Sequence, residues 1–235
     1  MILDALLPHY CYQCELRTGS NLPLCDTCQS SLARNHTYCR GCAVPLPTTS
    51  ATQGALTCPK CQCQPPSFSK VVAPFLYDES MAFLIHKWKF QGEMQLTVVL
   101  ANLWVSANYN AQHIDLIVPV PLHWQKLWSR GFNQAELLAR KIQTLQPDLK
   151  NKKIDTRMVV RTKATATQTN LAATARGYNL KAAFHSRKTC AGMRIAIVDD
   201  VMTTGSTASA MSECLISAGA KSVEVWCAAR TPAPS

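Results

Sequence analysis

The stretch Arg194–Ala208, RIAIVDDVMTTGSTA, decides the fold of this chain. Its apolar residues Ile195 to Val198 predict a fully buried β-strand, and two adjacent carboxylates follow where that strand ends. A run of hydroxyl residues around Gly205 then leads directly into a predicted helix that extends to Ala218. A strand that turns into a helix in this way indicates an α/β protein whose ligand lies at the carboxyl ends of parallel strands.

The turn between this strand and helix is typical of a phosphate-binding site. A helix start presents free backbone amides and the positive end of the helix dipole to an anion, and glycine allows the backbone to approach it closely. The residues predicted to hold the phosphate are Thr203, Thr204, Gly205, Ser206 and Thr207. Asp199 and Asp200 lie too near that phosphate to contact it favourably, so we expect them to accept hydrogen bonds from sugar hydroxyls.

Other nucleotide-binding motifs are absent from the sequence. Neither G-x-x-x-x-G-K-[ST] nor G-x-G-x-x-G occurs, so an NTPase loop and a dinucleotide-binding fold lose their main support. A plain helix-capping turn explains the TTGST run by itself, but it does not explain the buried strand and the paired aspartates before it.

The same alternation of strands and helices continues outward from this stretch. Apolar patterning predicts further strands over 71–77, 114–118, 158–160 and 223–227, and helices over 78–90, 96–105 and 135–145, with a basic turn at 123–130. This order predicts a parallel sheet with helices on both faces. Gln64 to Ser67 marks a boundary, so we expect two domains, 1–66 and 67–235.

Eight of the twelve cysteines form four C-x-x-C pairs before residue 62. This spacing lets two thiolates grip one face of a tetrahedral Zn²⁺, and two pairs complete a site with no open position for water. Pairing neighbours in order gives two structural zinc sites, and an interleaved arrangement of the pairs is the alternative. The predicted ligands are Cys11, Cys14, Cys25 and Cys28 for one ion, and Cys39, Cys42, Cys58 and Cys61 for the other.

A disulfide framework is the other interpretation of these cysteines, and it requires an oxidising compartment. The residues from Met1 to Pro8 lack the basic start and cleavage site of an export signal, so we expect a cytoplasmic protein with reduced thiols. No apolar run approaches the ~20 residues that cross a bilayer, so we expect no membrane insertion.

Positive charge is concentrated in the second half of the chain. Residues 126–194 hold fifteen Lys or Arg residues against Glu136, Asp148 and Asp155, a net charge of +12 in a chain whose formal net charge is +10. Such a field suits a polyanion, either a nucleic acid or a small phosphate-rich ligand, and a solvated basic surface without a partner is the alternative.

Several motifs together resemble one family. IVDDVMTTGST is similar to the phosphoribosyl pyrophosphate (PRPP) signature of type I phosphoribosyltransferases. The four C-x-x-C pairs, Ile85–Gly92 (IHKWKFQG), Val118–His123 (VPVPLH) and Arg130–Glu136 (RGFNQAE) resemble the ComF family of competence-associated, phosphoribosyltransferase-like proteins in the same order along the chain.

The resemblance implies a double zinc module on a type I phosphoribosyltransferase fold. It implies a catalytic Asp199, Asp200 and Arg130, with Arg130 on the pyrophosphate side, and a loop from Arg161 to Arg176 in which Lys163 and Arg176 also meet the departing pyrophosphate. Mg²⁺ would bind together with PRPP. The family implies transfer to an unidentified acceptor in DNA uptake or use; the alternative is a catalytically silent scaffold or sensor that binds single-stranded DNA or proteins of the competence machinery.

Overall fold

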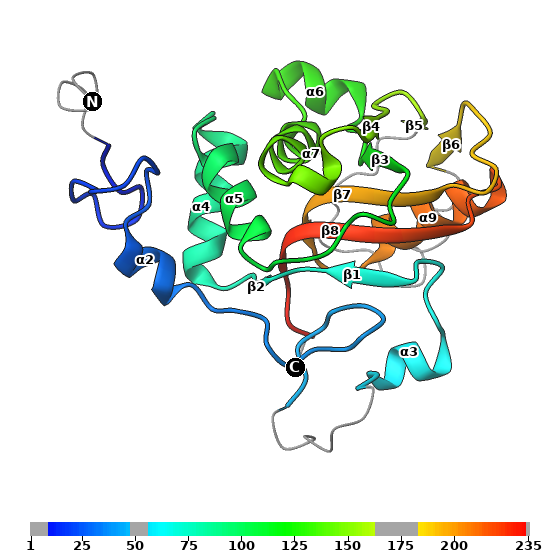
Figure 1. Ribbon diagram of the computed structural model, residues 1–235, viewed down its shortest axis with the longest axis horizontal. Helices are drawn as coiled ribbons and strands as arrows, with labels where there is room; N and C mark the ends of the chain where they lie inside the picture. The colour runs from blue at the N-terminus through cyan, green and yellow to red at the C-terminus, as the bar shows by residue number, and fades with distance from the viewer. Residues whose placement is uncertain (1–8, 48–55, 163–182, 234–235) are drawn as a thin grey trace.

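A parallel β-sheet forms the centre of the protein (Figure 1). The computed structural model describes residues 9–47, 56–162 and 183–233. The strand order is β1 (Lys70–Val72), β8 (Ser222–Arg230), β7 (Arg194–Met202), β3 (Leu116–Pro119) and β4 (Lys153–Ile154), and β2 (Phe75–Leu76) pairs with the end of β8. Every one of these pairings is parallel, as the continuous apolar strands predict.

Helices from the middle of the chain cover one face of the sheet. They are α4 (Glu79–Phe90), α5 (Leu96–Val105) and α7 (Gln134–Leu145), followed by the short 3₁₀ helix η2 (Pro147–Leu149); α6 (Trp124–Arg130) lies outside this layer and buries none of its residues. Asp78 caps α4 by accepting a hydrogen bond from the Met81 amide, and Asn133 caps α7 in the same way. Trp88, Trp104 and Trp226 are fully buried in the apolar layer between these helices and the sheet.

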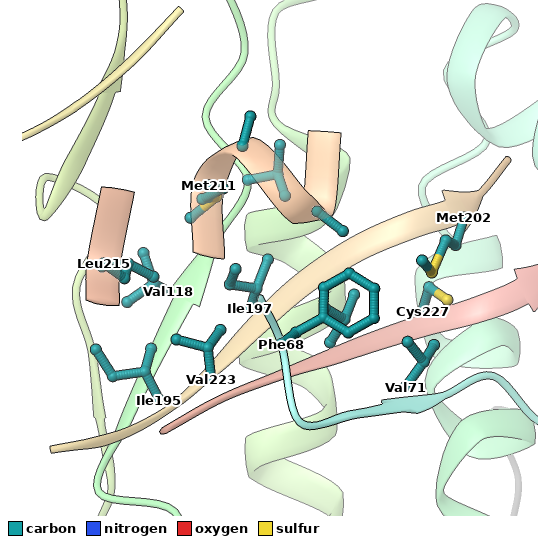
Figure 2. Packing of buried hydrophobic residues seen from close by; sticks show 14 of the residues in the cluster. Phe68, Val71, Val118, Ile195, Ile197, Met202, Met211, Leu215, Val223 and Cys227 are labelled. Carbon is teal, nitrogen blue, oxygen red and sulfur yellow. The ribbon is translucent and has the colours of Figure 1, made fainter. Parts of the chain in front are cut away.

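The opposite face packs against α9 (Ser206–Ser217) and against a two-stranded antiparallel sheet of β5 (Val159–Arg161) and β6 (Phe184–Ser186). Figure 2 shows Met211 and Leu215 of α9 over Ile195 and Ile197 of β7, with Phe68 beside them. Helices on both faces confirm the predicted α/β class.

The N-terminal segment contains the helices α2 (Asp26–Ser31) and α3 (Pro59–Cys63) and lies beside the β1 edge of the sheet. The Asn35 amide donates to the Pro74 carbonyl, and the Leu76 amide donates to the Ala33 carbonyl, both at 2.8 Å. These bonds cross the boundary that the sequence predicts near residue 66, so the zinc module is continuous with the edge of the sheet.

Three local predictions differ from the structure. The strand predicted over 71–77 is two short strands, because Ala73 and Pro74 interrupt the pairing and proline has no amide to donate. The basic turn predicted at 123–130 is the helix α6, which ends at Gly131 with a φ of +80°. The strand predicted to end at Val198 continues through both aspartates to Met202.

The described helices are each too short or too polar to cross a membrane.

Candidate functional site

The TTGST turn forms an anion-sized hollow at the carboxyl end of β7. Asp199, Met202 and residues 203–208 line this hollow, and Gly205 adopts a φ of +79° immediately before α9 begins. The Thr204 hydroxyl lies 2.7 Å from the Ser206 hydroxyl and accepts from the Ser206 amide. The turn therefore brings together the five residues predicted to bind phosphate at the start of a twelve-residue helix.

Asp199 and Asp200 lie where the alternation of side chains along β7 changes. Val198 and Val201 both pack in the layer under α4 and α5, whereas Ile197 and Met202 belong to the layer under α9. Each carboxylate accepts the next backbone amide: Asp199 Oδ1 from Asp200 N at 2.9 Å, and Asp200 Oδ1 from Val201 N at 2.6 Å. Their remaining oxygen atoms are the ones that can meet other groups.

A lysine from α4 pairs with the second aspartate. Lys89 Nζ lies 2.6 Å from Asp200 Oδ2, and both side chains are largely withdrawn from solvent. Lys89 was not among the site residues predicted from the sequence. A signal was present, because Met81, Ile85 and Lys89 share one helical stripe and the first two are buried. A charged residue on a buried stripe indicates a partner in the interior.

Three more cations surround the two aspartates. Arg130, at the end of α6, is attracted by Asp200, and it donates to Gln134 Oε1 at 2.7 Å. Arg161, at the end of β5, is attracted by Asp199. Loss of solvent around its amino group, and then the nearby Arg161, Arg130 and Lys89, lower the pKa of Lys126. Three cations thus interact with the two carboxylates and Lys126 lies beside these cations, so positive charge exceeds negative charge here, which favours an additional anion.

Burial, and then the neighbouring Asp200, raise the pKa of Asp199 to about 7. Attraction by Lys89 and Arg161 and the hydrogen bond from the Asp200 amide oppose that rise without cancelling it. A carboxylate whose charged form is disfavoured in this way binds readily to hydroxyl donors or a hard cation, which would stabilise that form. Such perturbed groups are typical of functional sites.

The structure thus collects Asp199, Asp200, Arg130 and residues 203–207 at one edge of the sheet. Lys163 and Arg176, and most of the loop predicted from Arg161 to Arg176, lie outside the described residues. Lys126 and Arg130 are four residues apart and share one face of α6. Because the sequence predicted a turn at 123–130, this shared face was not foreseen. Elsewhere in the basic stretch, Arg140, Lys188 and Arg194 pair with Glu136, Asp155 and Asp115, so its charge is partly neutralised away from the site.

The eight predicted zinc ligands form two clusters of four. The sulfur atoms of Cys11, Cys14, Cys25 and Cys28 all lie within 4.8 Å of one another, and so do those of Cys39, Cys42, Cys58 and Cys61. Consecutive C-x-x-C pairs therefore meet, and the interleaved alternative is wrong. None of the twelve cysteines is in a disulfide, and Cys63 lies exposed outside both clusters.

The donor set of both clusters fits tetrahedral zinc. In the second cluster, the Cys58 amide donates to Cys39 Sγ at 3.3 Å. Burial opposes ionisation of the Cys39 thiol, but the amides of Cys58, Cys42 and Gly41 lower its pKa to about 7. Amide hydrogen bonds to the sulfur favour the thiolate that binds a metal, so the residues present support structural zinc at both clusters.

Two family models match the chain. A double zinc ribbon domain covers residues 2–62, and a phosphoribosyl transferase domain covers residues 105–234. The first contains both cysteine clusters, and the second contains the TTGST turn with both aspartates.

Several relatives align with nearly the whole chain, across both of these parts. The chain is 35% identical to Competence protein F of Haemophilus influenzae over 218 residues, which cover 88% of this chain and 90% of the relative. The chain belongs to the ComF family. This ComF protein is also 32% identical to the DNA utilization protein YhgH of Escherichia coli O157:H7, over 96% of this chain and 98% of the relative. It is 26% identical to Competence protein ComFC of Bacillus subtilis, over 89% of this chain and 78% of the relative.

Proposed function

We propose that this ComF protein binds PRPP together with Mg²⁺ and transfers the phosphoribosyl group to an acceptor during the uptake or use of DNA. The observation that carries the proposal is the convergence of Lys89, Arg130 and Arg161 on Asp199 and Asp200, with Lys126 beside these cations and a helix-start phosphate turn next to them. One anion site at the turn and a second, cation-rich one beyond the aspartates match a sugar that carries phosphate at both ends.

Each part of the site has a role in this proposal. The 5′-phosphate accepts hydrogen bonds from the amides and hydroxyls of residues 203–207. The ribose hydroxyls donate to Asp199 and Asp200. The pyrophosphate lies against Arg130, with Lys89, Lys126 and Arg161 around it, and Lys163 and Arg176 approach from the loop as the resemblance implies.

The reaction breaks the bond between the anomeric carbon and the pyrophosphate oxygen, and its electron pair leaves with the pyrophosphate. The acceptor forms the new bond on that carbon and releases a proton. Positive charge develops on the ribose and negative charge on the leaving group, so Asp199 and Asp200 stabilise the first while Arg130 and its neighbouring cations stabilise the second.

Two adjacent carboxylates fit a hard cation, since Mg²⁺ prefers oxygen ligands and takes several of them from a phosphate substrate, and the raised pKa of Asp199 indicates that neighbouring cations do not fully compensate its charged form. Mg²⁺ bound with PRPP would neutralise charge on the pyrophosphate. Asp199 and Asp200 are the residues of this chain that would hold it, directly or through the ribose hydroxyls.

Calorimetry with PRPP and Mg²⁺ tests binding, and release of pyrophosphate tests turnover. The Asp200→Ala and Arg130→Met variants should each weaken PRPP binding at least tenfold. Arg140→Met removes an exposed arginine of α7 that pairs with Glu136, and it should leave binding unchanged. Absence of PRPP binding by the zinc-loaded wild-type protein would reject the proposal.

A specific observation favours single-stranded DNA as a second ligand. Helix α6 buries none of its residues, and it exposes Trp124 (66%) and Trp128 (88%) beside Lys126 and Arg130. Exposed aromatic rings among cations are typical of surfaces that stack bases and neutralise phosphates. The relatives' names, which refer to competence and DNA utilization, support the same choice.

Oligonucleotide binding at several salt concentrations tests this second function, because phosphate contacts give a steep negative slope of log affinity against log salt. Trp128→Ala should weaken binding by about tenfold, since one stacked base contributes about 1–3 kcal/mol. Trp128→Phe keeps an aromatic ring and should retain most of the affinity. A flat salt dependence would reject single-stranded DNA as a ligand. The alternatives would then be that the basic face binds proteins of the competence machinery, or that the protein is a catalytically silent scaffold.

A further inference from the structure

One buried arginine connects the second cysteine cluster with the phosphate turn. Arg230 is the last residue of β8 and is 6% exposed. Its Nε donates to the carbonyl of Cys42 at 2.9 Å, and its Nη1 donates to the carbonyl of Met202 at 3.0 Å and to that of Thr203. The same nitrogen also donates to the Thr231 carbonyl at 2.8 Å. A single side chain thus bonds to a metal-binding knuckle and to the start of the phosphate turn.

No carboxylate among the described residues pairs with the charge of this arginine. All of its hydrogen-bond partners there are main-chain carbonyls, and none is a carboxylate. A buried guanidinium satisfied only by neutral acceptors keeps a large positive potential around it. That potential acts on the adjacent turn, where it favours a bound anion.

The arginine also fixes the direction of the turn's amides. In a planar trans peptide, the carbonyl of one residue and the amide of the next point in opposite directions. Because the Met202 and Thr203 carbonyls face Arg230, the amides of Thr203 and Thr204 face away from it. Preorganised amides of this kind bind an anion without paying for reorientation during binding.

The other end of the bridge lies in the second cluster. Cys42 is one of its four ligands, and Cys39, Cys42, Cys58 and Cys61 share an apolar layer with Met202 and Ala208. The first cluster belongs instead to the layer under α4 and α5, through Cys11. Within the part of the chain that the structure describes, only the second cluster therefore has both a polar bridge and apolar packing that reach the phosphate turn.

We propose that Arg230 is a positioning residue that couples zinc in the second cluster to anion binding at the phosphate turn. This inference rests on the proposed function only for the identity of the anion as PRPP. Because coupling between two sites is reciprocal, the anion should retain that zinc as strongly as that zinc improves anion binding.

The experiment measures zinc release into a chromogenic chelator, with and without inorganic phosphate, pyrophosphate or PRPP with Mg²⁺. Wild-type protein should release two ions in two phases, and the anion should slow one phase at least threefold. The Cys14→Ser variant lacks a ligand of the first cluster, so its remaining phase belongs to the second cluster and should be the one that the anion slows. In Arg230→Met, the anion should no longer slow that phase, and calorimetry should show anion affinity at least tenfold weaker.

Two further variants separate positioning from general stability. Arg194 begins β7 at the far end of the strand and pairs with Asp115 on the surface, so Arg194→Met should leave coupling and affinity as in wild type. Arg230→Lys keeps the charge but has no planar fork to span three carbonyls, so it should recover part of the anion affinity without recovering the coupling.

Three outcomes would overturn the inference: zinc release that no anion slows in the wild type, equal effects of Arg194→Met and Arg230→Met, or full recovery of coupling by Arg230→Lys. If inorganic phosphate slows release of the second zinc while PRPP does not bind, the inference stands and the proposed transferase function fails. If PRPP binds and no anion slows release, the transferase proposal stands and the coupling is rejected.

Discussion

Lys89 Nζ lies 2.6 Å from Asp200 Oδ2, so the carboxylate that we expect to meet a ribose hydroxyl already has a cationic partner from α4. The ammonium group of Lys89 also attracts Asp199 and opposes the rise in its pKa. In the proposed complex, a ribose hydroxyl would take the place of Lys89 beside Asp200, and Lys89 would then contact the pyrophosphate.

Replacing Lys89 with methionine should weaken PRPP binding by about tenfold, or about 1.4 kcal/mol, because one charge-assisted contact to the pyrophosphate is lost. Calorimetry measures the change. Lys87→Met is the matched control, because the Lys87 ammonium lies over the ring of Phe83, away from the aspartates. Equal losses in the two variants would contradict a specific role for Lys89.

The raised pKa of Asp199 predicts that stability falls with rising pH. A free aspartate has a pKa near 3.9, whereas that of Asp199 in the folded protein is about 7. Between these values the folded state binds more protons than the unfolded state, so the free energy of unfolding decreases as the pH rises from about 4 to about 7 and then levels off. The decrease should be about 1–2 kcal/mol, after allowance for partial solvent access to the pair.

Urea unfolding of wild type and Asp199→Asn at pH 5, 6, 7 and 8 checks this pH dependence. The asparagine variant lacks the titrating group, so its stability relative to wild type should increase over this range. A constant difference between the two proteins would show that Asp199 ionises normally. Because ligand hydroxyls favour the ionised form, PRPP binding near pH 6.5 should also release a proton, which calorimetry in buffers of different ionisation enthalpy detects.

Gly205→Ala should damage the phosphate turn itself. A side chain at this residue is strained by the φ of +79°, and its Cβ would lie 2.7 Å from Met202 Cε. We expect a loss of about 1–2 kcal/mol in the free energy of unfolding and a larger, at least tenfold, loss of PRPP affinity. Gly92→Ala carries similar backbone strain at a φ of +74° with open space around it, so it should lose stability but keep affinity.

A buried hydrogen bond between α4 and α5 supports the helix that carries Lys89. The Trp88 indole Nε1 donates to Thr97 Oγ1 at 2.9 Å. Thr97→Val keeps the volume but leaves that buried donor without its acceptor, which should reduce the free energy of unfolding by about 1–3 kcal/mol. Thr97→Ser keeps the hydroxyl and should lose less. Urea unfolding of both variants measures these losses. If the valine variant were more stable than the serine variant, the hydrogen bond from Trp88 to Thr97 would not stabilise the protein.

Most of the fold, and about half of the candidate site, could be predicted from patterns among residues that are neighbours in the sequence. The strand, the aspartates, Gly205 and helix α9 follow one another along the chain, so their geometry could be predicted from neighbouring residues alone. The C-x-x-C spacing predicted two metal sites but not which pairs meet, because that depends on the path of the chain between them. Arg161 and Arg230 had no local signal. Arg230 contacts Cys42 across 188 residues, and only the folded sheet brings the two together.

The two cysteine clusters pack into the two different apolar layers of the sheet, and the residues between them bond to Pro74 and to Leu76 of β2. The N-terminal segment therefore contacts both faces of the sheet, with one metal cluster on each side. An open strand edge is a template on which another copy of a chain can add itself. Because the segment between the two metal clusters pairs with β2, loss of the metals should expose this strand to another copy of the chain, so we expect aggregation to accompany metal starvation even where the phosphate turn is intact.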